Sequence, residues 1–517
     1  MSDSVDRGIT VTEMTPMDQP IDVSPETTAA FVGRALRGPL NTPLLVNSFG
    51  EFRRRFGDVW TRSSLAPAVK QFFEHGGRNL YVVRVANNAR GAMICLPASG
   101  SALVLRALEP GSTERIRVAV DFDGIDADND QLFNLTLQRV DPDTRLVTDQ
   151  EMFRRVDYRH DTERFVADVL LTSSLARVEQ PYPAHRPEAT FGMDTSFEPA
   201  YIEHSQPGSD GQELSDYDLI GSKIRGTGIF ALDKVVQIDL LYLPPPGKGR
   251  DPGPAPLLAA ERYCRQRGAM LIVDPPVEWV TPAKAVAGIR AMGLASPSML
   301  GYFPRMYRRH EENGVPRAVG GALAGLLCKH DRTFGPWQGL DQQGMGFSRE
   351  LVAAFEVCGE DEQMLTREGL NVIARGPAGR ARLRNSVTMG RGSESHRKFA
   401  SLPVRRSCLR IVNAIEQATR WAVFEPDDFQ LATRIRAQVV AFLSGLADMG
   451  AFENDSFVVE CDAGVSHRAD SLEHGVTVLV VFQPLGCREP VSFTLHQTVA
   501  GCRVTTSAFP PVMEHCA

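Results

Sequence analysis

The sequence predicts a mixed α/β protein whose central sheet is interrupted by a β-rich insertion. Two observations predict the sheet: a strand-strand-helix-helix-strand pattern over residues 28–89, and strands that alternate with helices between residues 235 and 303. A third predicts the insertion, because residues 90–219 contain no lysine and show short runs that alternate between polar and apolar side chains. A chain of 517 residues is expected to form roughly two to four domains.

The unit at 28–89 forms the N-terminal part of the predicted sheet. An apolar strand leads into a turn rich in glycine and proline, a second short strand covers 44–46, and two helices precede a last strand at 80–85. The residues that mark its turns and its last strand are Gly33, Gly38, Pro39, Gly76, Gly77 and Arg84.

Residues 220–400 supply the rest of this sheet. A near-continuous apolar run at 235–243 predicts a strand, and further strands are expected at 270–273 and 298–303. Helices are expected between them at 257–267 and 282–292, which is the order of a mostly parallel sheet covered on both faces. The N-terminal unit is expected to complete the same sheet.

Residues 401–489 have a third character, dominated by helices. One helical stretch runs through Trp421, and a second helix is expected at 428–449 because apolar side chains recur there every three or four positions. Two β-prone runs follow at 476–482 and 491–499. The polar residues 1–27 and the end of the chain, 490–517, are expected to be extended arms. The apolar positions of the second helix are Leu431, Ile435, Val439, Phe442 and Leu446.

No constellation for catalysis, metal binding or cofactor binding emerges from the motifs. The nine cysteines form no CxxC pair, and His310 lacks a second histidine at metal-ligand spacing. The glycine-rich stretch at 320–325 lacks the GK[ST] end of a phosphate loop and favours a tightly packed helix. Asp274 follows a strand, where α/β enzymes keep catalytic groups, but a capped turn is the preferred interpretation. A net charge of −7 does not indicate the basic surface that nucleic-acid binding requires.

Several segments, in this order along the chain, resemble the contractile tail sheath proteins of phages and related injection machines. They are the N-terminal unit, the run 321–337 with Asp331, and the Gly-Leu-Asn-Val-Ile segment at 369–373. The chain departs from the family pattern at Asp427, where asparagine is usual, and at Val387, where arginine is common. The remaining matching residues are Asn371, Arg405, Arg406, Trp421, Phe424, Glu425, Pro426, Pro484 and Pro490.

The resemblance implies a mechanical subunit without cofactor or catalytic centre. Such subunits polymerise as stacked hexameric rings around an inner tube protein, between baseplate and tail-terminator proteins, and exchange terminal strands with their neighbours. The insertion would face outward, and the C-terminal region would face the tube, with Arg434 and Arg436 as candidate contacts. The candidate residues of the exchanged strands are Ile9, Thr10, Val11, Thr12, Val491, Phe493 and Leu495.

Two alternatives remain open from the sequence. The chain could be another structural component of the same machine, such as a baseplate or terminator protein. It could instead be an α/β enzyme that uses Asp274 or Arg84. The start of the sequence lacks the charge and apolar order of a signal peptide, so assembly is expected in a cytoplasm, as part of a phage tail or of an extracellular or cellular contractile particle.

Overall fold

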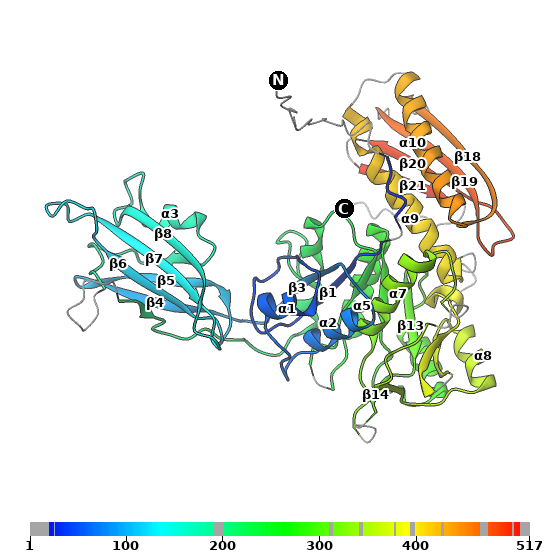
Figure 1. Cartoon of the computed structure of the whole chain (residues 1–517), viewed down its shortest axis with the longest axis horizontal. Coiled ribbons are helices and arrows are strands. Elements are labelled where there is room, and N and C mark those ends of the chain that lie inside the picture. The colour runs from blue at the N-terminus through cyan, green and yellow to red at the C-terminus, as the bar shows by residue number, and fades with distance from the viewer. Residues whose placement is uncertain are drawn as a thin grey trace, which may run out of the picture.

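Three bodies make up the computed structural model: a β-rich insertion domain, a central α/β core and a C-terminal domain (Figure 1). The structure describes residues 20–24, 26–190, 200–247, 249–309, 314–340, 345–376, 379–392, 399–424, 429–465, 474–498 and 501–506.

The core is built on an eight-stranded sheet to which both the N-terminal unit and the segment after the insertion contribute. β1 (Ala29–Gly33) lies between β3 (Leu80–Arg84) and β11 (Leu240–Tyr242) and is parallel to both. The predicted completion of one sheet by two distant parts of the chain is therefore confirmed. The order is β17-β16-β13-β12-β11-β1-β3-β2, with β2 (Leu44–Val46), β12 (Met270–Val273), β13 (Met299–Phe303), β16 (Asn371–Arg375) and β17 (Ala381–Arg384).

Helices cover both faces of this sheet, as the alternating pattern predicts. Side chains from successive strand residues point to opposite faces, so Phe31 joins one hydrophobic cluster while Val32 joins the other. The first face is covered by α1 (Phe49–Phe56), α2 (Leu65–Glu74) and α7 (Gly320–Phe334). The second is covered by α4 (Asp216–Ile220), a 3-10 helix (Gly228–Lys234), α5 (Pro254–Arg267), α6 (Pro282–Met292) and α8 (Gly359–Arg367).

The strand expected at 235–243 is shorter than its apolar sequence suggests. Only Leu240–Tyr242 pairs in the sheet, and the preceding residues close the second face instead. Val235 and Ile238 are buried in the cluster of that face, whereas Val236 is exposed. The apolar run therefore indicates that these residues are buried, but not that they form a strand. A segment that packs on the face of a sheet is as apolar as a strand within it.

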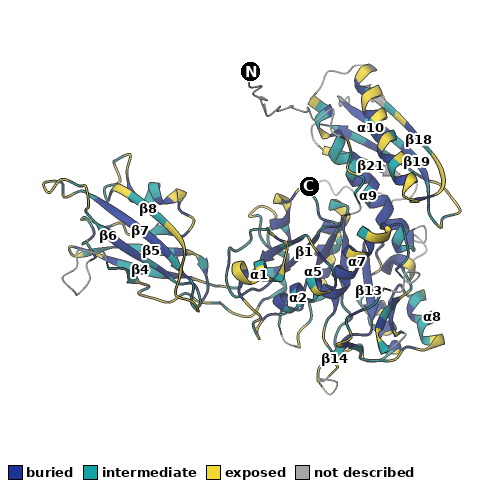
Figure 2. Ribbon diagram, in the orientation of Figure 1, coloured by how far each residue is buried: buried dark blue, intermediate teal, exposed yellow. Residues whose placement is uncertain are grey.

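The insertion domain packs two sheets against each other. One contains β4 (Gly91–Ala98), β5 (Ser101–Pro110) and β9 (Ala176–Glu179). The other has the order β10-β6-β7-β8. Apolar side chains of both sheets form one hydrophobic cluster, separate from those of the core. Figure 2 shows the buried stretches of these strands apart from the core. The strands of the second sheet are β6 (Ile116–Asp121), β7 (Leu132–Val140), β8 (Val147–Asp157) and β10 (Ile202–Glu203), and the short helix α3 covers Val166–Val169.

In the C-terminal domain, two helices pack on a four-stranded antiparallel sheet. They are α9 (Leu402–Thr419) and α10 (Phe429–Asp448), and all five apolar positions predicted for the second helix are buried. The sheet has the order β18-β19-β20-β21, with β18 (Phe452–Val465), β19 (His474–Pro484), β20 (Val491–Thr498) and β21 (Gly501–Thr506). In the core, β14 (Met306–Arg308) and β15 (Leu351–Ala353), which flank α7 in the sequence, pair as a separate two-stranded antiparallel sheet.

None of the described helices combines the length and the apolar character that crossing a lipid bilayer requires.

Candidate functional site

Asp274, the strongest catalytic candidate, is a helix cap. It directly follows β12, and its Oδ1 accepts hydrogen bonds from the backbone N–H groups of Val319, at 3.0 Å, and Gly320, at 2.9 Å. Its Oδ2 accepts the hydroxyl of Tyr242. Burial raises the pKa of Asp274, although Arg305 opposes this shift. Oδ1 therefore caps the start of α7, and Oδ2 holds Tyr242 of β11. The carboxylate is a structural cap, but of a distant helix rather than of its own turn.

Arg84 is also a structural residue. It ends β3 and is 1% exposed, and its guanidinium donates to the carbonyls of Ala35 at 3.1 Å and Pro110 at 2.7 Å. It also donates to the carbonyls of Leu36 and Gly38. Burial lowers the pKa of Arg84 to about 10. The side chain therefore fastens the loop after β1 to the end of β5, at the junction between the core and the insertion domain.

That junction, which we call the neck, is a ribbon in which residues 87–93 run antiparallel to 206–212. Glycines allow its backbones to touch: a Cβ on Gly208 would stand 2.2 Å from the carbonyl oxygen of Gly111. One on Gly211 would stand 2.0 Å from the carbonyl oxygen of Asn87. Since only glycine tolerates such an approach, the neck is a close-packed joint rather than a loose linker.

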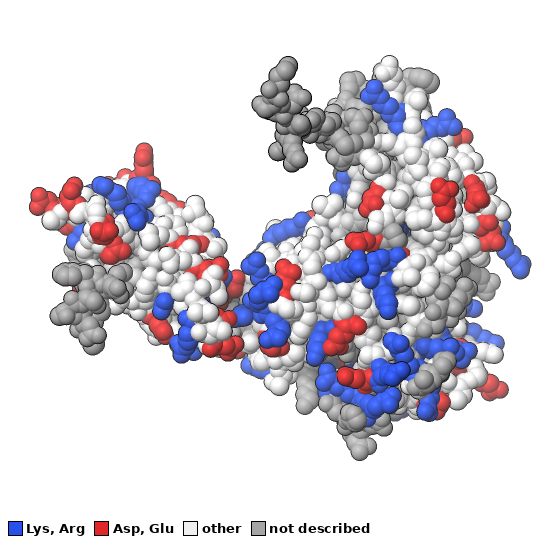
Figure 3. All heavy atoms as spheres, viewed as in Figure 1, with Lys and Arg blue, Asp and Glu red and all other residues white. Residues whose placement is uncertain are grey.

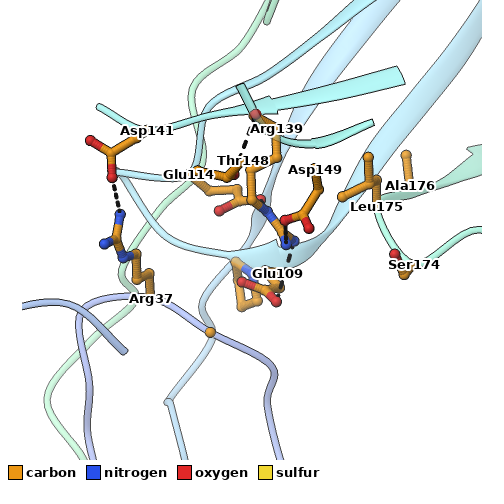
Figure 4. Close-up of polar contacts among 12 residues, drawn as sticks. Arg37, Glu109, Glu114, Arg139, Asp141, Thr148, Asp149, Ser174, Leu175 and Ala176 are labelled. Atoms are coloured by element: carbon orange, nitrogen blue, oxygen red, sulfur yellow. Dashed lines mark hydrogen bonds and ion pairs between the residues drawn. The ribbon is translucent and has the colours of Figure 1, made fainter. Parts of the chain in front are cut away.

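A cluster of charges reinforces the neck (Figure 4). Arg139 lies 2.9 Å from Glu114 and 3.2 Å from Glu109, and Arg37 of the core lies 3.5 Å from Asp141 of the insertion domain. Burial would lower the pKa of Arg139, but the two glutamates outweigh it and raise that pKa. Burial also raises the pKa of Glu109, against the effect of Arg139. The Arg37–Asp141 pair ties the two domains together directly.

A second junction, which we call the anchor, joins the segment before β1 to the core and to the C-terminal domain. The side chain of Thr27 donates to Asp331 of α7, and Arg406 of α9 holds both oxygens of the same carboxylate, one at 2.8 Å. Burial alone would raise the pKa of Asp331, but Arg406, His330 and Thr27 outweigh it and lower that pKa. The backbone N–H of Thr28 donates to Asp239 at 2.7 Å.

The anchor continues along the C-terminal domain. Arg410 of α9 donates to the carbonyls of Ser24 and Glu26, the second at 3.4 Å. Ile21 and Val23 pack against the hydrophobic cluster of the C-terminal domain. The described chain therefore begins at Pro20 on the surface of that domain and crosses to the core. The predicted strand residues Ile9, Thr10, Val11 and Thr12 lie outside the described residues.

The C-terminal arm, predicted at 490–517, does not begin where the sequence suggested, because its first strand lies inside the sheet of the C-terminal domain. Val491, Phe493 and Leu495 are buried in β20, which pairs with β19 on one side and with β21 on the other. A strand whose two edges are both occupied within the chain has no edge to offer a neighbour. Among the described strands of this sheet, the outer edges belong to β18 and β21. Alternating apolar residues identified a strand, but they could not distinguish the middle of a sheet from its edge.

The two arginines proposed to face a tube lie on the exposed side of α10. Arg434 and Arg436 are both exposed, and Arg436 Nε donates to the carbonyl of Val459 in β18 at 3.1 Å. Trp421 packs partly against the domain core, whereas Phe424 is 79% exposed. Glu425 and Pro426, like Asp427, lie outside the described residues.

The remaining motif residues stabilise the core. The side-chain amide of Asn371 donates to the carbonyls of Gly301 and Val387 and accepts the N–H of Val387 at 2.7 Å. Arg405, next to Arg406, donates to the Ser298 hydroxyl at 3.1 Å. Gly38 has φ +100°, which side chains other than glycine rarely adopt. The sequence marked Asp331 and Arg406 in separate motifs, but no signal in it joined them, because 75 positions separate them.

Comparison with known proteins identifies this architecture. No family model matches the sequence, and no curated protein matches it either. Among solved structures, the sheath tail protein Lin1278 of Listeria innocua aligns with a TM-score of 0.62 at 12% identity, over 93% of this chain and 97% of its own. A sheath tail protein of Desulfitobacterium hafniense aligns with a TM-score of 0.52 at 10% identity, over 95% and 100%. The helical sheath of the anti-feeding prophage, in its contracted state, also aligns at 0.52, with 14% identity over 94% and 98%. The chain therefore has the fold of the tail sheath proteins.

Proposed function

We propose that this chain is a structural subunit of a contractile sheath, which polymerises as stacked hexameric rings around an inner tube and contracts to drive that tube through a target envelope. The observation that carries the proposal is the extent of the shared fold. It spans 93–95% of this chain and 97–100% of the three sheath proteins, and so includes both domains attached to the core. A likeness limited to the parallel sheet would fit many enzymes.

The two catalytic candidates support a mechanical role. Asp274 caps α7 and Arg84 binds four backbone carbonyls, so the polar groups of both are engaged in holding the fold. A contractile sheath needs no such chemistry of its own. It assembles in an extended packing and moves to a more stable, compact one, so the work comes from the difference in packing free energy.

Subunits would stay connected through their terminal segments. The outer edges of β18 and β21 offer backbone N–H and C=O groups, and the sequence continues before Pro20 and beyond Thr506. Pairing of a neighbour's terminal segment with such an edge is β-augmentation, which supplies main-chain hydrogen bonds and tolerates rotation between subunits. Residues 9–13 of the N-terminal segment are β-prone and remain the proposed strand on that side.

The insertion domain would face outward and the C-terminal domain would face the tube. Residues 90–219 carry 24 acidic side chains against 12 arginines, a net charge of −12. Figure 3 shows acidic and basic side chains side by side on the visible face of this domain. The excess of acidic groups makes exposure to solvent more favourable than packing between copies of itself. Arg434 and Arg436 remain the proposed tube contacts, although the bond from Arg436 to β18 means that its replacement also affects the domain itself.

Electron microscopy of the purified chain, alone and with its tube protein, tests the function. Long helical tubes or stacked six-membered rings are the expected result, and rings that never extend into tubes would point to a baseplate or terminator role. A monodisperse monomer across concentrations and salts, with and without the tube protein, would contradict both.

Deletion of residues 1–19 tests the exchange of strands. The anchor begins at Pro20, so the truncated chain should keep the melting temperature of the full chain but fail to form a contractile sheath. Deletion of 507–517 makes the same test at the other end. Normal tubes from both truncations would refute strand exchange and would leave the fold assignment unaffected.

A further inference from the structure

A rigid loop at residues 221–228, which we call the knob, displays an isoleucine to solvent. Ile224 is 98% exposed, Lys223 and Arg225 flank it and are exposed, and Tyr217 of the preceding helix α4 is 81% exposed. Tyrosine and arginine are among the side chains most often responsible for binding energy at protein interfaces. Among the described residues, neither Lys223 nor Arg225 has an ion-pair partner.

Hydrogen bonds within the loop hold the knob in one conformation. The N–H of Thr227 donates to the carbonyl of Ser222 at 3.0 Å, and the N–H of Ser222 donates to the Thr227 hydroxyl at 2.9 Å. Gly221 and Gly228 close the loop where its two ends cross, since a Cβ on Gly221 would stand 2.0 Å from the carbonyl oxygen of Thr227. A side chain presented by a rigid loop loses little conformational entropy on binding.

A surface that complements the knob lies elsewhere on the same layer of helices. Between α6 and α8 there is an open depression of about 380 Å³, lined by Arg290, Glu360, Gln363, Met364, Arg367 and Glu368. The thioether of Met364 can accommodate an aliphatic side chain. Within the lining, Arg290 and Glu368 form an ion pair with each other, so Glu360 is the carboxylate left to receive a cation, with Arg367 also in the lining.

The knob and the depression belong to opposite ends of this layer. The knob lies between α4 and the 3-10 helix that contacts β3, near the β2 edge of the sheet. α8 contacts β16, next to the β17 edge, and Figure 1 shows β3 and α8 on opposite sides of the core. Two different surfaces at opposite ends of a subunit produce a head-to-tail contact, which propagates into rings or helices.

We infer that the knob of one copy of this chain docks into the α6–α8 depression of a neighbouring copy. Ile224 packs on Met364, and Lys223 or Arg225 pairs with Glu360. This inference rests on the proposed sheath function and adds a side-chain contact to the exchange of terminal strands. It also explains why an isoleucine stands exposed on a loop that glycines make rigid.

Replacement of Ile224 with aspartate tests the contact. Because the side chain is almost fully exposed, Ile224→Asp should leave the melting temperature of the monomer unchanged but raise the critical concentration for tube formation at least about tenfold. Leu171→Asp, at a 65% exposed leucine on the insertion domain, is the matched control and should polymerise as the native chain does. An unchanged critical concentration for Ile224→Asp, in a chain whose native form makes tubes, overturns the inference and leaves the proposed function standing.

Two further variants identify the partner surface. Arg225→Glu should weaken polymerisation, and Arg225→Glu combined with Glu360→Arg should restore part of it. With exposed Cys358 replaced by serine, Ile224→Cys together with Gln363→Cys should give a ladder of disulfide-linked multimers on oxidation, and neither single cysteine should. Absence of both the charge rescue and the ladder in intact tubes overturns the assignment to α6 and α8. A native chain that forms no tubes at all counts instead against the proposed function.

Discussion

The neck and the anchor each join a domain to the core through a buried arginine, but the two arginines are satisfied differently. Arg84 in the neck binds four neutral carbonyls, and burial lowers its pKa to about 10. Burial would also lower the pKa of Arg406 in the anchor, but Asp331 outweighs it and raises that pKa. The guanidinium in the neck is therefore bound by neutral carbonyls, and the carboxylates of Glu109 and Asp210 only partly offset the cost of its burial. The anchor instead holds a directly bonded pair of opposite charges.

This difference determines what fails when each junction is damaged. Removal of one partner from a buried ion pair leaves a bare charge inside the protein, which costs more than the loss of hydrogen bonds to a neutral group. The anchor also joins three parts of the chain, namely residues 20–28, α7 and α9, whereas Arg84 fastens loops at a single edge. Loss of the anchor should therefore destabilise the whole core, and loss of Arg84 should loosen the neck.

The largest expected effect is that of Asp331→Ala. It leaves Arg406 buried without its carboxylate and removes the acceptor of Thr27, so the free energy of unfolding should fall by about 3–5 kcal/mol in urea titrations. Glu416→Ala removes the surface partner of Arg420 and should cost well under about 1 kcal/mol. Equal losses for the two variants would mean that the anchor does not bear on global stability.

A smaller and local effect is expected for Arg84→Met. Methionine fills part of the space, and removal of the guanidinium also removes the cost of its burial, so the net loss should be about 1–3 kcal/mol. Limited proteolysis should show earlier cleavage near residues 34–41 and 206–212, while the C-terminal domain stays protected. Arg90→Met, at an exposed arginine of the neck, should digest like the native chain. If Arg84→Met were instead cleaved faster along the whole chain, Arg84 would stabilise the entire core, as the anchor is expected to do, and not only the neck.

Removal of the insertion domain should change the core less still. Arg90 and Ser209 are paired across the neck, so a short Gly/Ser bridge can replace residues 91–208 without separating the two strands. Because the domain has its own hydrophobic cluster, the melting temperature of the remainder should stay close to that of the native chain. Tubes should also still form, in contrast to the terminal deletions. Loss of tubes as complete as in those deletions would show that the insertion domain belongs to the lattice.

The smallest expected effect is on the pH dependence of stability, to which the anchor and the neck contribute with opposite signs. The lowered pKa of Asp331 contributes stability above its ordinary value of 3.8, which is lost as the pH falls through the folded-state pKa. The raised pKa of Glu109 has the opposite sign: its ionisation costs stability as the pH rises from 4.5 towards the folded-state pKa. Glu109→Gln should therefore flatten the pH dependence of the melting temperature just above pH 4.5 and leave the acid-induced loss in place. An unchanged profile would mean that Glu109 titrates normally.

The sequence alone determined the elements whose signals are local. Helix α6 and strand β12 have the predicted bounds, and the apolar stripe of α10 is buried as its spacing required. The lack of lysine and the alternating runs between residues 90 and 219 correspond to a body with its own hydrophobic cluster. Each of these features depends on residues that are close together in the sequence, within one or two helical turns or within one strand. Over such distances, hydrophobic periodicity and turn residues are enough to predict the structure.

Only the tertiary structure decided which distant residues meet. Thr27 and Asp331 are 304 positions apart, and no periodic pattern marks them as partners. The same holds for β20, whose sequence predicted a strand but not its place between β19 and β21, and for the knob, whose exposed Ile224 resembles any apolar residue in a linear reading. The physical reason is that pairing, burial and exposure depend on the free energy of the whole packed chain, to which local preference contributes only a part.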